Sequence, residues 1–141
     1  MTCTFFGHAS FIKSIEEELK LKITSLINQG VSQFYVGNNG LFDLTVQTIL
    51  AELSRKRTDF NYSVVLSRLN EASLTKDQSK TLFPYGLEKS LPRFAISKRN
   101  EWLIDNSDLV VCFVTHNYSN SYKWVERARR KGLKIIHIAS D

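Results

Sequence analysis

Short apolar runs alternate along the chain with longer stretches in which apolar residues recur at helical spacing. The runs predict strands at residues 2–7, 34–37, 62–69, 109–115 and 133–139, and the stretches between them predict helices. Residues 70–81 and 83–92 are polar or rich in proline and glycine, which predicts irregular structure. Two strands joined through a helix run parallel, because the helix provides the crossover. We therefore expect an α/β fold, a Rossmann-like doubly wound parallel sheet of about five strands with helices on both faces.

The length of 141 residues is that of one domain, which we expect to span residues 1–141. Hydrophobic residues make up 43% of the chain and charged residues 23%, the composition of an ordinary globular protein. The longest apolar runs are too short to cross a bilayer, so we expect no membrane partner. The first residues lack the basic start and the cleavage site of a signal peptide, which predicts a cytoplasmic location.

The formal net charge of +5 raises the question of an anionic partner. The cations cluster at residues 55–57 and 127–131, where the predicted helices end and where positive charge complements the helix dipole. The sequence has no basic stripe with interleaved aromatic residues of the kind that binds single strands. We therefore do not expect a nucleic-acid partner, while the charge favours weak attraction of a small anion.

Cysteine and histidine give little sign of a metal site. Cys3 and Cys112 each lie inside an apolar run, which predicts two reduced thiols in the core. They form no CxxC pair, so neither a zinc site nor a redox motif is indicated. His8 and His116 are two imidazoles without a matched third ligand. We expect no metal and no cofactor.

Polar residues follow three of the predicted strands. A doubly wound sheet binds its ligands at the carboxyl ends of the strands, beside the point where the strand order reverses. If the predicted strands lie in the order 3-2-1-4-5, the ends of the first and fourth strands border this crevice, with His8 and His116 on either side. The candidate ligand-binding residues at the strand ends are Gly7, His8, Gly37, Asn38, Asn39, Gly40, Thr115, His116, Asn117, Tyr118 and Ser119.

The segment FYVGNNGLFD, residues 34–43, is either a plain turn between a strand and a helix or a cradle for a ligand. Gly37 and Gly40 allow positive φ and leave backbone N–H groups uncovered. The helix that follows would direct its free N–H groups and positive dipole end at an anion. Asp43, in the first turn of that helix, would repel a nearby phosphate. It is better suited to accept hydrogen bonds from ribose hydroxyls or from the N–H groups of the loop itself.

Arg99 and Glu126 are the candidates for catalysis. Arg99 lies in the predicted third helix and would point toward the crevice if the Ile96 face is inward. The alternative is a surface arginine paired with Glu101 or Asp105. Glu126 lies in the predicted fourth helix, and it could equally be an ordinary surface residue.

Three segments together resemble the YpsA-like branch of the SLOG superfamily, which includes the Smf/DprA and Lonely Guy proteins. TCTFFGH, residues 2–8, is similar to its first strand signature, and FYVGNNGLFD is similar to its second motif, a glycine-containing turn followed by an aspartate. FAISKRNEWLIDNSDLVVCFVTH, residues 94–116, is similar to its third segment, where an Arg-Asn pair precedes the fourth strand. The resemblance extends from residue 2 to residue 139.

The resemblance implies a domain that binds a nucleotide or a nucleotide-derived ligand, such as a cyclic or ADP-ribose-type signal, and that assembles as a homo-oligomer. Some members are thought to sense nucleotide signals in bacterial and phage defence, whereas Lonely Guy members are phosphoribohydrolases. The residues that match the family motifs are Gly7, His8, Gly37, Asn38, Gly40, Asp43, Arg99, Asn100 and Glu126.

The edge after the predicted fourth strand departs from the Lonely Guy motif P-G-G-x-G-T-x-x-E. In YSNSYKWVE, residues 118–126, the glutamate is present but the three glycines and the threonine are replaced. Side chains then occupy the place where backbone N–H groups approach phosphate in the hydrolase. Tyr118, Tyr122 or Trp124 could instead stack on a base, and Lys123 could meet a phosphate as a point charge.

These observations lead to two hypotheses of different class. The main one is a sensor or sequestering protein that binds a nucleotide-derived ligand without turning it over. The alternative is a phosphoribohydrolase-like nucleotide hydrolase in which Glu126 acts as the general acid or base, or stabilises the developing positive sugar, and Arg99 holds the phosphate or the ribose.

Overall fold

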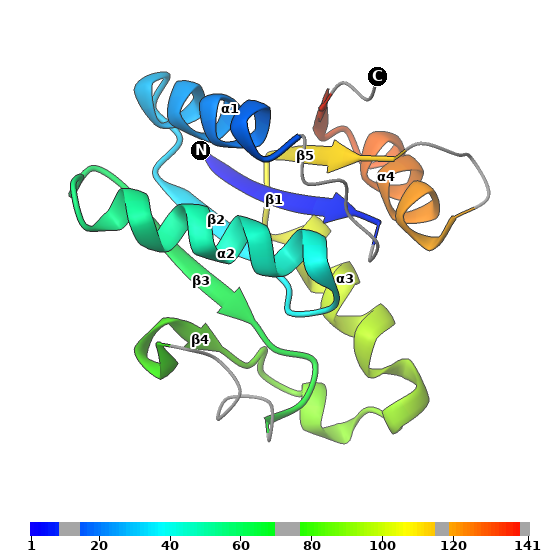
Figure 1. Cartoon of the computed structure of the whole chain (residues 1–141). Coiled ribbons are helices and arrows are strands. Elements are labelled where there is room, and N and C mark those ends of the chain that lie inside the picture. The colour runs from blue at the N-terminus through cyan, green and yellow to red at the C-terminus, as the bar shows by residue number, and fades with distance from the viewer. Residues whose placement is uncertain (9–14, 70–76, 115–118, 139–141) are drawn as a thin grey trace.

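The computed structural model describes residues 1–8, 15–69, 77–114 and 119–138, and this part of the chain contains a six-stranded parallel sheet and four α-helices (Figure 1). None of its helices is long and apolar enough to cross a membrane. The strands are β1 (Thr2–Gly7), β2 (Gln33–Val36), β3 (Asn61–Val65), β4 (Thr81–Leu82), β5 (Leu109–Phe113) and β6 (Lys134–His137). The α-helices are α1 (Glu16–Asn28), α2 (Leu41–Ser54), α3 (Ala95–Asp105) and α4 (Asn120–Arg130), and the short 3-10 helices are η3 (Gln78–Lys80), η4 (Leu87–Lys89) and η5 (Pro92–Phe94).

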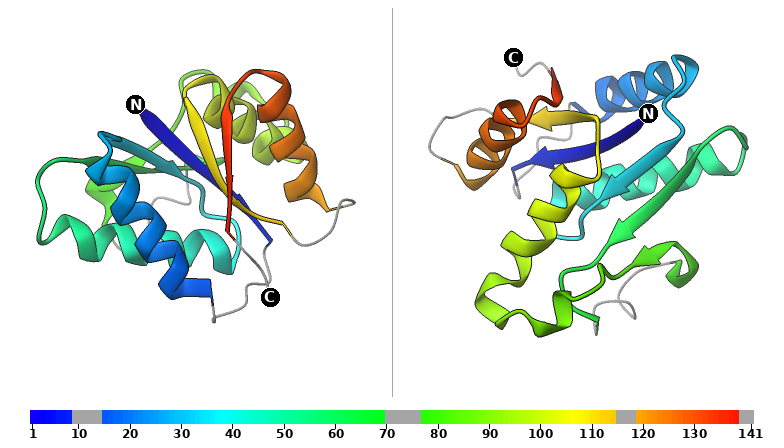
Figure 2. Two further views of the ribbon diagram at one scale, coloured as in Figure 1. Left: turned by 90° about the horizontal axis from the view of Figure 1, so that it is seen from above. Right: turned by 180° about the vertical axis from the view of Figure 1, so that it is seen from behind.

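Helices cover both faces of the sheet, with α1 and α2 on one side and α3 and α4 on the other (Figure 2). Successive side chains of β1 point to opposite faces. Phe5 therefore packs beside Phe34 of β2 in the core under α1 and α2, with ring centroids 6.0 Å apart. Phe6 packs against Trp124 of α4 in the second core, at 6.4 Å. The chain has the Rossmann-like doubly wound α/β fold that its sequence predicts.

The strand order places a crevice at one end of β1. The order is β4-β3-β2-β1-β5-β6, so β1 lies between β2 and β5 and the order reverses beside it. The register pairs Gly7 with Phe113, which brings the carboxyl ends of β1 and β5 together. Apart from β4, this is the order 3-2-1-4-5 on which the predicted crevice depends.

The sheet has one strand more than the sequence predicts. β4 lies at the end of the segment predicted to be irregular, where Thr81 and Leu82 pair with Val64 and Val65 of β3. The ladder continues with Leu66 N–H, which donates to Leu82 O at 2.8 Å. A strand of two residues is too short to show alternation. Its formation depends on the open edge of β3 rather than on a pattern of its own.

Both cysteines are buried and free, as predicted. Burial raises the pKa of the Cys3 thiol, and it raises the pKa of the Cys112 thiol to about 11. Neither thiol is therefore ionised at neutral pH, which is the behaviour of inert core cysteines.

Candidate ligand-binding pocket

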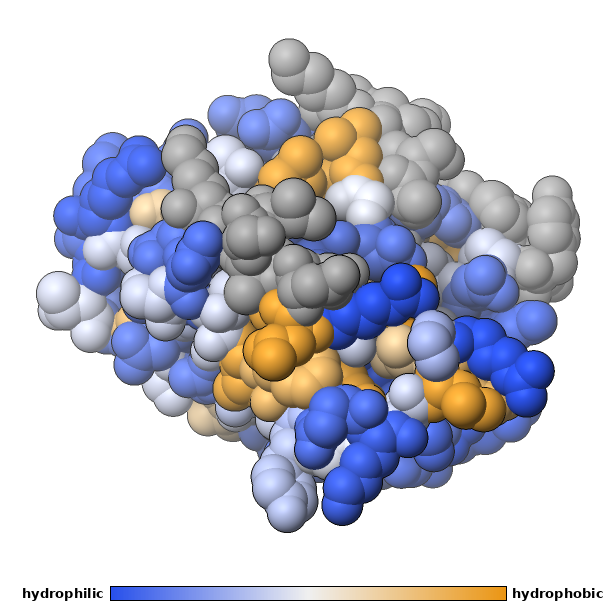
Figure 3. All heavy atoms as spheres, turned by 90° about the horizontal axis from the view of Figure 1, so that it is seen from below, coloured by the Kyte–Doolittle hydropathy of each residue, from blue (hydrophilic) through white to orange (hydrophobic). Residues whose placement is uncertain are grey.

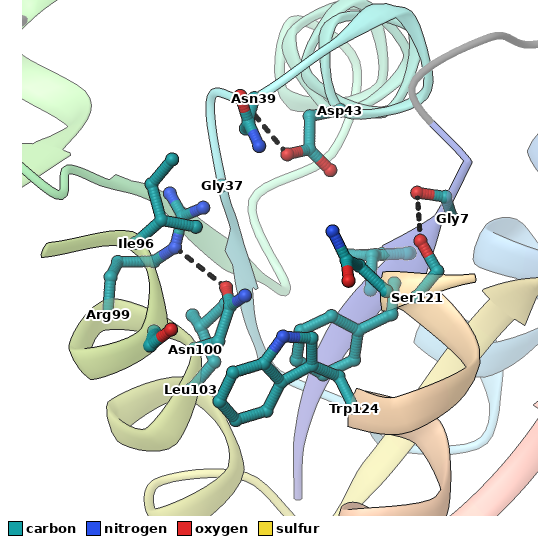
Figure 4. A pocket seen from close by; sticks show the side chains of 14 residues that line it. Gly7, Gly37, Asn39, Asp43, Ile96, Arg99, Asn100, Leu103, Ser121 and Trp124 are labelled. Atoms are coloured by element: carbon teal, nitrogen blue, oxygen red, sulfur yellow. Dashed lines mark hydrogen bonds between the residues drawn. The ribbon is translucent and has the colours of Figure 1, made fainter. Parts of the chain in front are cut away.

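A pocket of about 350 Å³ opens at the carboxyl ends of β1 and β2 (Figure 4). Its walls come from the turn between β2 and α2, from α3 and from the first turns of α4. The pocket thus occupies the crevice beside the reversal of strand order, which is where doubly wound sheets bind ligands. Its volume is at the small end of the range for ligand sites, about 300–1,000 Å³.

Gly37, at the end of β2, separates a cation from a carboxylate. A Cβ atom at this position would lie 2.9 Å from Arg99 Nη1 and 2.9 Å from Asp43 Oδ2. Real Cβ atoms do not approach other atoms so closely, so a side chain here would displace one of the two groups. Gln47 of α2 donates a hydrogen bond to Gly37 O at 2.9 Å and holds the turn from the other side. This glycine is required for the approach of two charged side chains of the protein itself.

Arg99 of α3 is only 2% exposed, so the surface alternative for this residue is wrong. Its Nε donates to Asn100 Oδ1 at 3.0 Å, and its Nη1 donates to Asn38 Oδ1 at 3.0 Å and to Val65 O at 3.1 Å. A buried guanidinium is tolerated only when its N–H groups are hydrogen-bonded. By meeting this requirement, Arg99 joins α3 to the β2–α2 turn and to the end of β3.

Asp43 lies in the first turn of α2 and is 9% exposed. Its Oδ2 accepts the backbone N–H of Asn39 at 2.9 Å, which is one of the two roles that the sequence predicts for it. Burial raises the pKa of the carboxyl to about 6, although the charge of Arg99 and the Asn39 N–H both act to lower it. Within the described part of the chain Oδ1 accepts no hydrogen bond, and it faces the open side of the pocket (Figure 4).

The opposite wall is formed by α4 against the end of β1. Ser121 Oγ donates to Gly7 O at 2.7 Å, and the Trp124 ring continues this wall beside Phe6. Ring atoms of Phe42 lie 2.4–2.6 Å from the position of a Cβ atom on Gly7, so only glycine leaves room for that ring. These contacts bring the beginnings of α2 and α4 to the same strand end.

Several residues predicted from the sequence come together here. Those that line the pocket are Gly7, Gly37, Asn39, Asp43, Arg99 and Asn100. Asn38 contributes indirectly, because its side chain accepts a hydrogen bond from Arg99. Gly40 directly precedes α2 with φ at 108°, a value that favours glycine, and so permits the sharp entry into the helix.

Other predicted residues lie elsewhere or outside the described residues. His8 is buried, its backbone N–H donates to Phe113 O at 3.3 Å, and its ring packs edge-on against the Phe113 ring. Ser119 caps α4, with Oγ accepting the N–H of Tyr122 at 3.1 Å. Lys123 is exposed and is not part of the pocket lining. The predictions outside the described residues are those for Thr115, His116, Asn117 and Tyr118.

Of the two predicted catalytic residues, Arg99 lines the pocket and Glu126 does not. Glu126 forms an ion pair with Arg129 one turn along α4, as expected if it is an ordinary surface residue. The pocket therefore does not present the pair of side chains on which the predicted hydrolase depends.

The pocket lining also contains residues that were not predicted from the sequence as pocket residues, which are Ile96, Ser97 and Leu103 of α3 and Asn120 and Ser121 of α4. For α4 a signal was present, since small polar residues in the first turn of a helix that follows a strand lie at the carboxyl end of the sheet. For α3 there was none, because helical spacing does not show which face of the helix borders an opening.

No protein-family model matches the chain, and the curated proteins contain no match to it. The family resemblance therefore stays a prediction. In the described ranges, no group of three or more His, Cys, Asp and Glu side chains is placed to hold a metal ion. The geometry defines a small polar pocket with a buried, hydrogen-bonded arginine and an ionisable carboxyl.

Proposed function

We propose that the protein binds a nucleotide or a nucleotide-derived ligand in this pocket and acts as a sensor or sequestering protein. The observation that carries the proposal is the position of the pocket, at the carboxyl ends of β1 and β2 where the strand order reverses. Sheets of this topology bind nucleotides at that point. The lining also combines apolar surface with a few convergent polar groups, as small-ligand sites do.

The composition of the lining favours binding over turnover. A general acid or base must come within hydrogen-bond reach of the reacting atom. Glu126 is paired with Arg129 away from the lining, and the buried Arg99 directs donors to protein oxygens. No observation supports the alternative of a phosphoribohydrolase-like enzyme that uses Arg99 and Glu126.

The family resemblance supports the ligand class and the setting. It favours a cyclic or ADP-ribose-type signal and a role in bacterial or phage defence signalling. Assembly as a homo-oligomer stays a prediction from the same resemblance.

Mass spectrometry of the purified, then denatured, protein tests the proposal directly. We expect a nucleotide-derived compound to be released, and calorimetry with the purified compound should return a saturable affinity. If no such compound is released, the affinity is measured instead by calorimetry with nucleoside monophosphates, cyclic nucleotides and ADP-ribose. Absence of binding across this panel would refute the proposal.

A base-release assay separates binding from catalysis. Nucleoside monophosphates are incubated with the wild-type protein and with Glu126→Ala. We expect no release above background in either case. Turnover by the wild type that is lost in Glu126→Ala would establish the hydrolase instead.

A further inference from the structure

We infer that the pocket takes the hydroxyl-bearing sugar of a ribonucleoside, recognised by Asp43, and that Arg99 is a positioning residue for this carboxylate rather than a phosphate-binding residue. The inference rests on the proposed function and states which part of the ligand enters the pocket.

Two residues carry the charge of the described pocket lining, Arg99 and Asp43. Arg99 is almost fully buried, and its Nε and Nη1 donate to oxygens of α3, the β2–α2 turn and β3. A ligand in the pocket therefore meets the carboxylate more readily than the guanidinium. A phosphate next to Asp43 would be repelled by the carboxylate, and the nearby Arg99 offers little compensation because its Nε and Nη1 already donate to protein oxygens.

Two polar atoms face the pocket without a partner in the described part of the chain. One is Asp43 Oδ1, an acceptor. The other is the side-chain nitrogen of Asn100, a donor, which is turned to the pocket because Asn100 Oδ1 accepts from Arg99 Nε at 3.0 Å (Figure 4). Phosphate oxygens can only accept hydrogen bonds, whereas a hydroxyl donates and accepts at once. Ribose hydroxyls therefore complement both atoms.

Arg99 acts on Asp43 through the β2–α2 turn. Its Nη1 holds the side chain of Asn38, and the backbone N–H of the next residue, Asn39, binds Asp43 Oδ2. The guanidinium and the carboxylate also flank Gly37 at the same distance from its Cβ position. The turn therefore binds one carboxylate oxygen of Asp43, Oδ2, and leaves the other, Oδ1, for a ligand.

The remaining surfaces of the pocket suit the other parts of a nucleoside. Ile96 and Leu103 of α3 and Trp124 of α4 supply apolar and aromatic surface, on which a base can pack (Figure 4). Asn120 and Ser121 mark the N-terminal end of α4, whose dipole favours negative charge. The 5′-phosphate of a nucleotide would lie at that end, away from Asp43. Figure 3 shows apolar residues next to polar residues on one face of the molecule.

Calorimetry on the full chain with defined ligands tests the inference. The ligands are adenosine, guanosine, cytidine and uridine, their 5′-monophosphates, and the 2′-deoxy and 3′-deoxy nucleosides. For the bases that bind, we expect the nucleoside and its monophosphate to have affinities within about tenfold of each other, because the phosphate adds only an interaction with the exposed N-terminal end of α4. Loss of a hydroxyl that Asp43 binds should weaken binding about ten- to a hundredfold, as for hydrogen bonds to charged groups.

Two variants and a control assign the effect to named residues. Asp43→Asn should remove most of the preference for ribose over deoxyribose, whereas Asp105→Asn, at an exposed ion pair with Lys131, should leave it unchanged. Arg99→Lys keeps the charge but cannot reproduce the forked hydrogen bonds. It should reduce the preference for ribose by about tenfold, whereas a merely structural role would weaken ribose and deoxyribose ligands equally.

The possible outcomes separate this inference from the proposed function. Wild-type affinities alone decide the sugar question, so a variant that fails to fold does not remove the test. Monophosphates bound more than a hundredfold tighter than nucleosides, with no loss for deoxy ligands, would overturn the inference and leave nucleotide binding in place. Absence of binding by the nucleosides and monophosphates would overturn the inference, and absence of binding by cyclic nucleotides and ADP-ribose as well, at concentrations up to the millimolar range, would overturn both.

Discussion

Asp43→Asn tests the electrostatics of the pocket without any ligand. Asparagine has nearly the same shape as aspartate, and its side-chain oxygen can still accept the Asn39 N–H that binds Oδ2 at 2.9 Å. It cannot ionise, however. In the folded protein burial raises the pKa of the Asp43 carboxyl from 3.8 to about 6, with Arg99 as the named charge that opposes this rise. Ionisation of Asp43 therefore costs more free energy in the folded state than in the unfolded chain.

The sign and size of the effect follow from this shift. Below pH 3.8 the carboxyl is protonated in both states, and it adds no pH dependence. Between pH 3.8 and about 6 the folded state holds the proton more tightly, so the free energy of unfolding falls as the pH rises. Above that window the loss is complete, and a shift of this size corresponds to about 3 kcal/mol. We expect Asp43→Asn to gain up to that amount over the wild type between pH 4 and pH 7.5.

Urea unfolding followed by circular dichroism from pH 4 to pH 8 measures this gain. The relevant quantity is the difference in free energy of unfolding between variant and wild type at each pH, because groups common to both proteins cancel. Asp105→Asn is the matched control, and as an exposed ion-paired site it should change stability by no more than about 1 kcal/mol. A difference for Asp43→Asn that stays flat over the whole range, or that favours the wild type as the pH rises, would refute the reasoning.

Three further substitutions probe the walls of the pocket. Gly37→Ala should lower the free energy of unfolding by about 1–3 kcal/mol in urea titrations and weaken ligand binding, because its Cβ would lie 2.9 Å from two charged groups; unchanged stability would contradict this. Trp124→Leu should weaken nucleoside binding about tenfold in calorimetry, whereas Trp102→Leu, at a half-buried tryptophan outside the pocket, should not; equal losses would count against the site. Glu126→Gln should leave the ligand affinity within about twofold of the wild type, because Glu126 belongs to a surface ion pair. A larger loss of affinity would show that Glu126 takes part in ligand binding.

The turn that follows β2 was in part predictable from the sequence. The glycines and asparagines of residues 37–40 were predicted to border a crevice, and Gly37 and Asn39 line the pocket. This was predictable because glycine, asparagine and the start of a helix have local conformational preferences. In the structure the turn makes contacts within the protein, because Gly37 makes room for Arg99 and Asp43.

The environment of Arg99 could not be predicted in the same way. Its hydrogen-bond partner Asn38 is 61 residues away in the sequence, and Val65 O lies at the end of another strand. The spacing of α3 was equally consistent with a surface residue. Burial of the guanidinium became evident only when three elements were placed against one another.

The sequence by itself determined the alternation of strands and helices, the parallel sheet and the polar turn at the end of β2. These properties depend on periodicity and on the conformations open to each residue type, which act over a few neighbouring positions. Only the tertiary structure decided that Asp43 and Arg99 flank Gly37, that Glu126 is not part of the pocket lining, and that the Arg99 guanidinium donates to protein oxygens. Such facts depend on burial and on contacts between distant segments, and these set the energy of a charge.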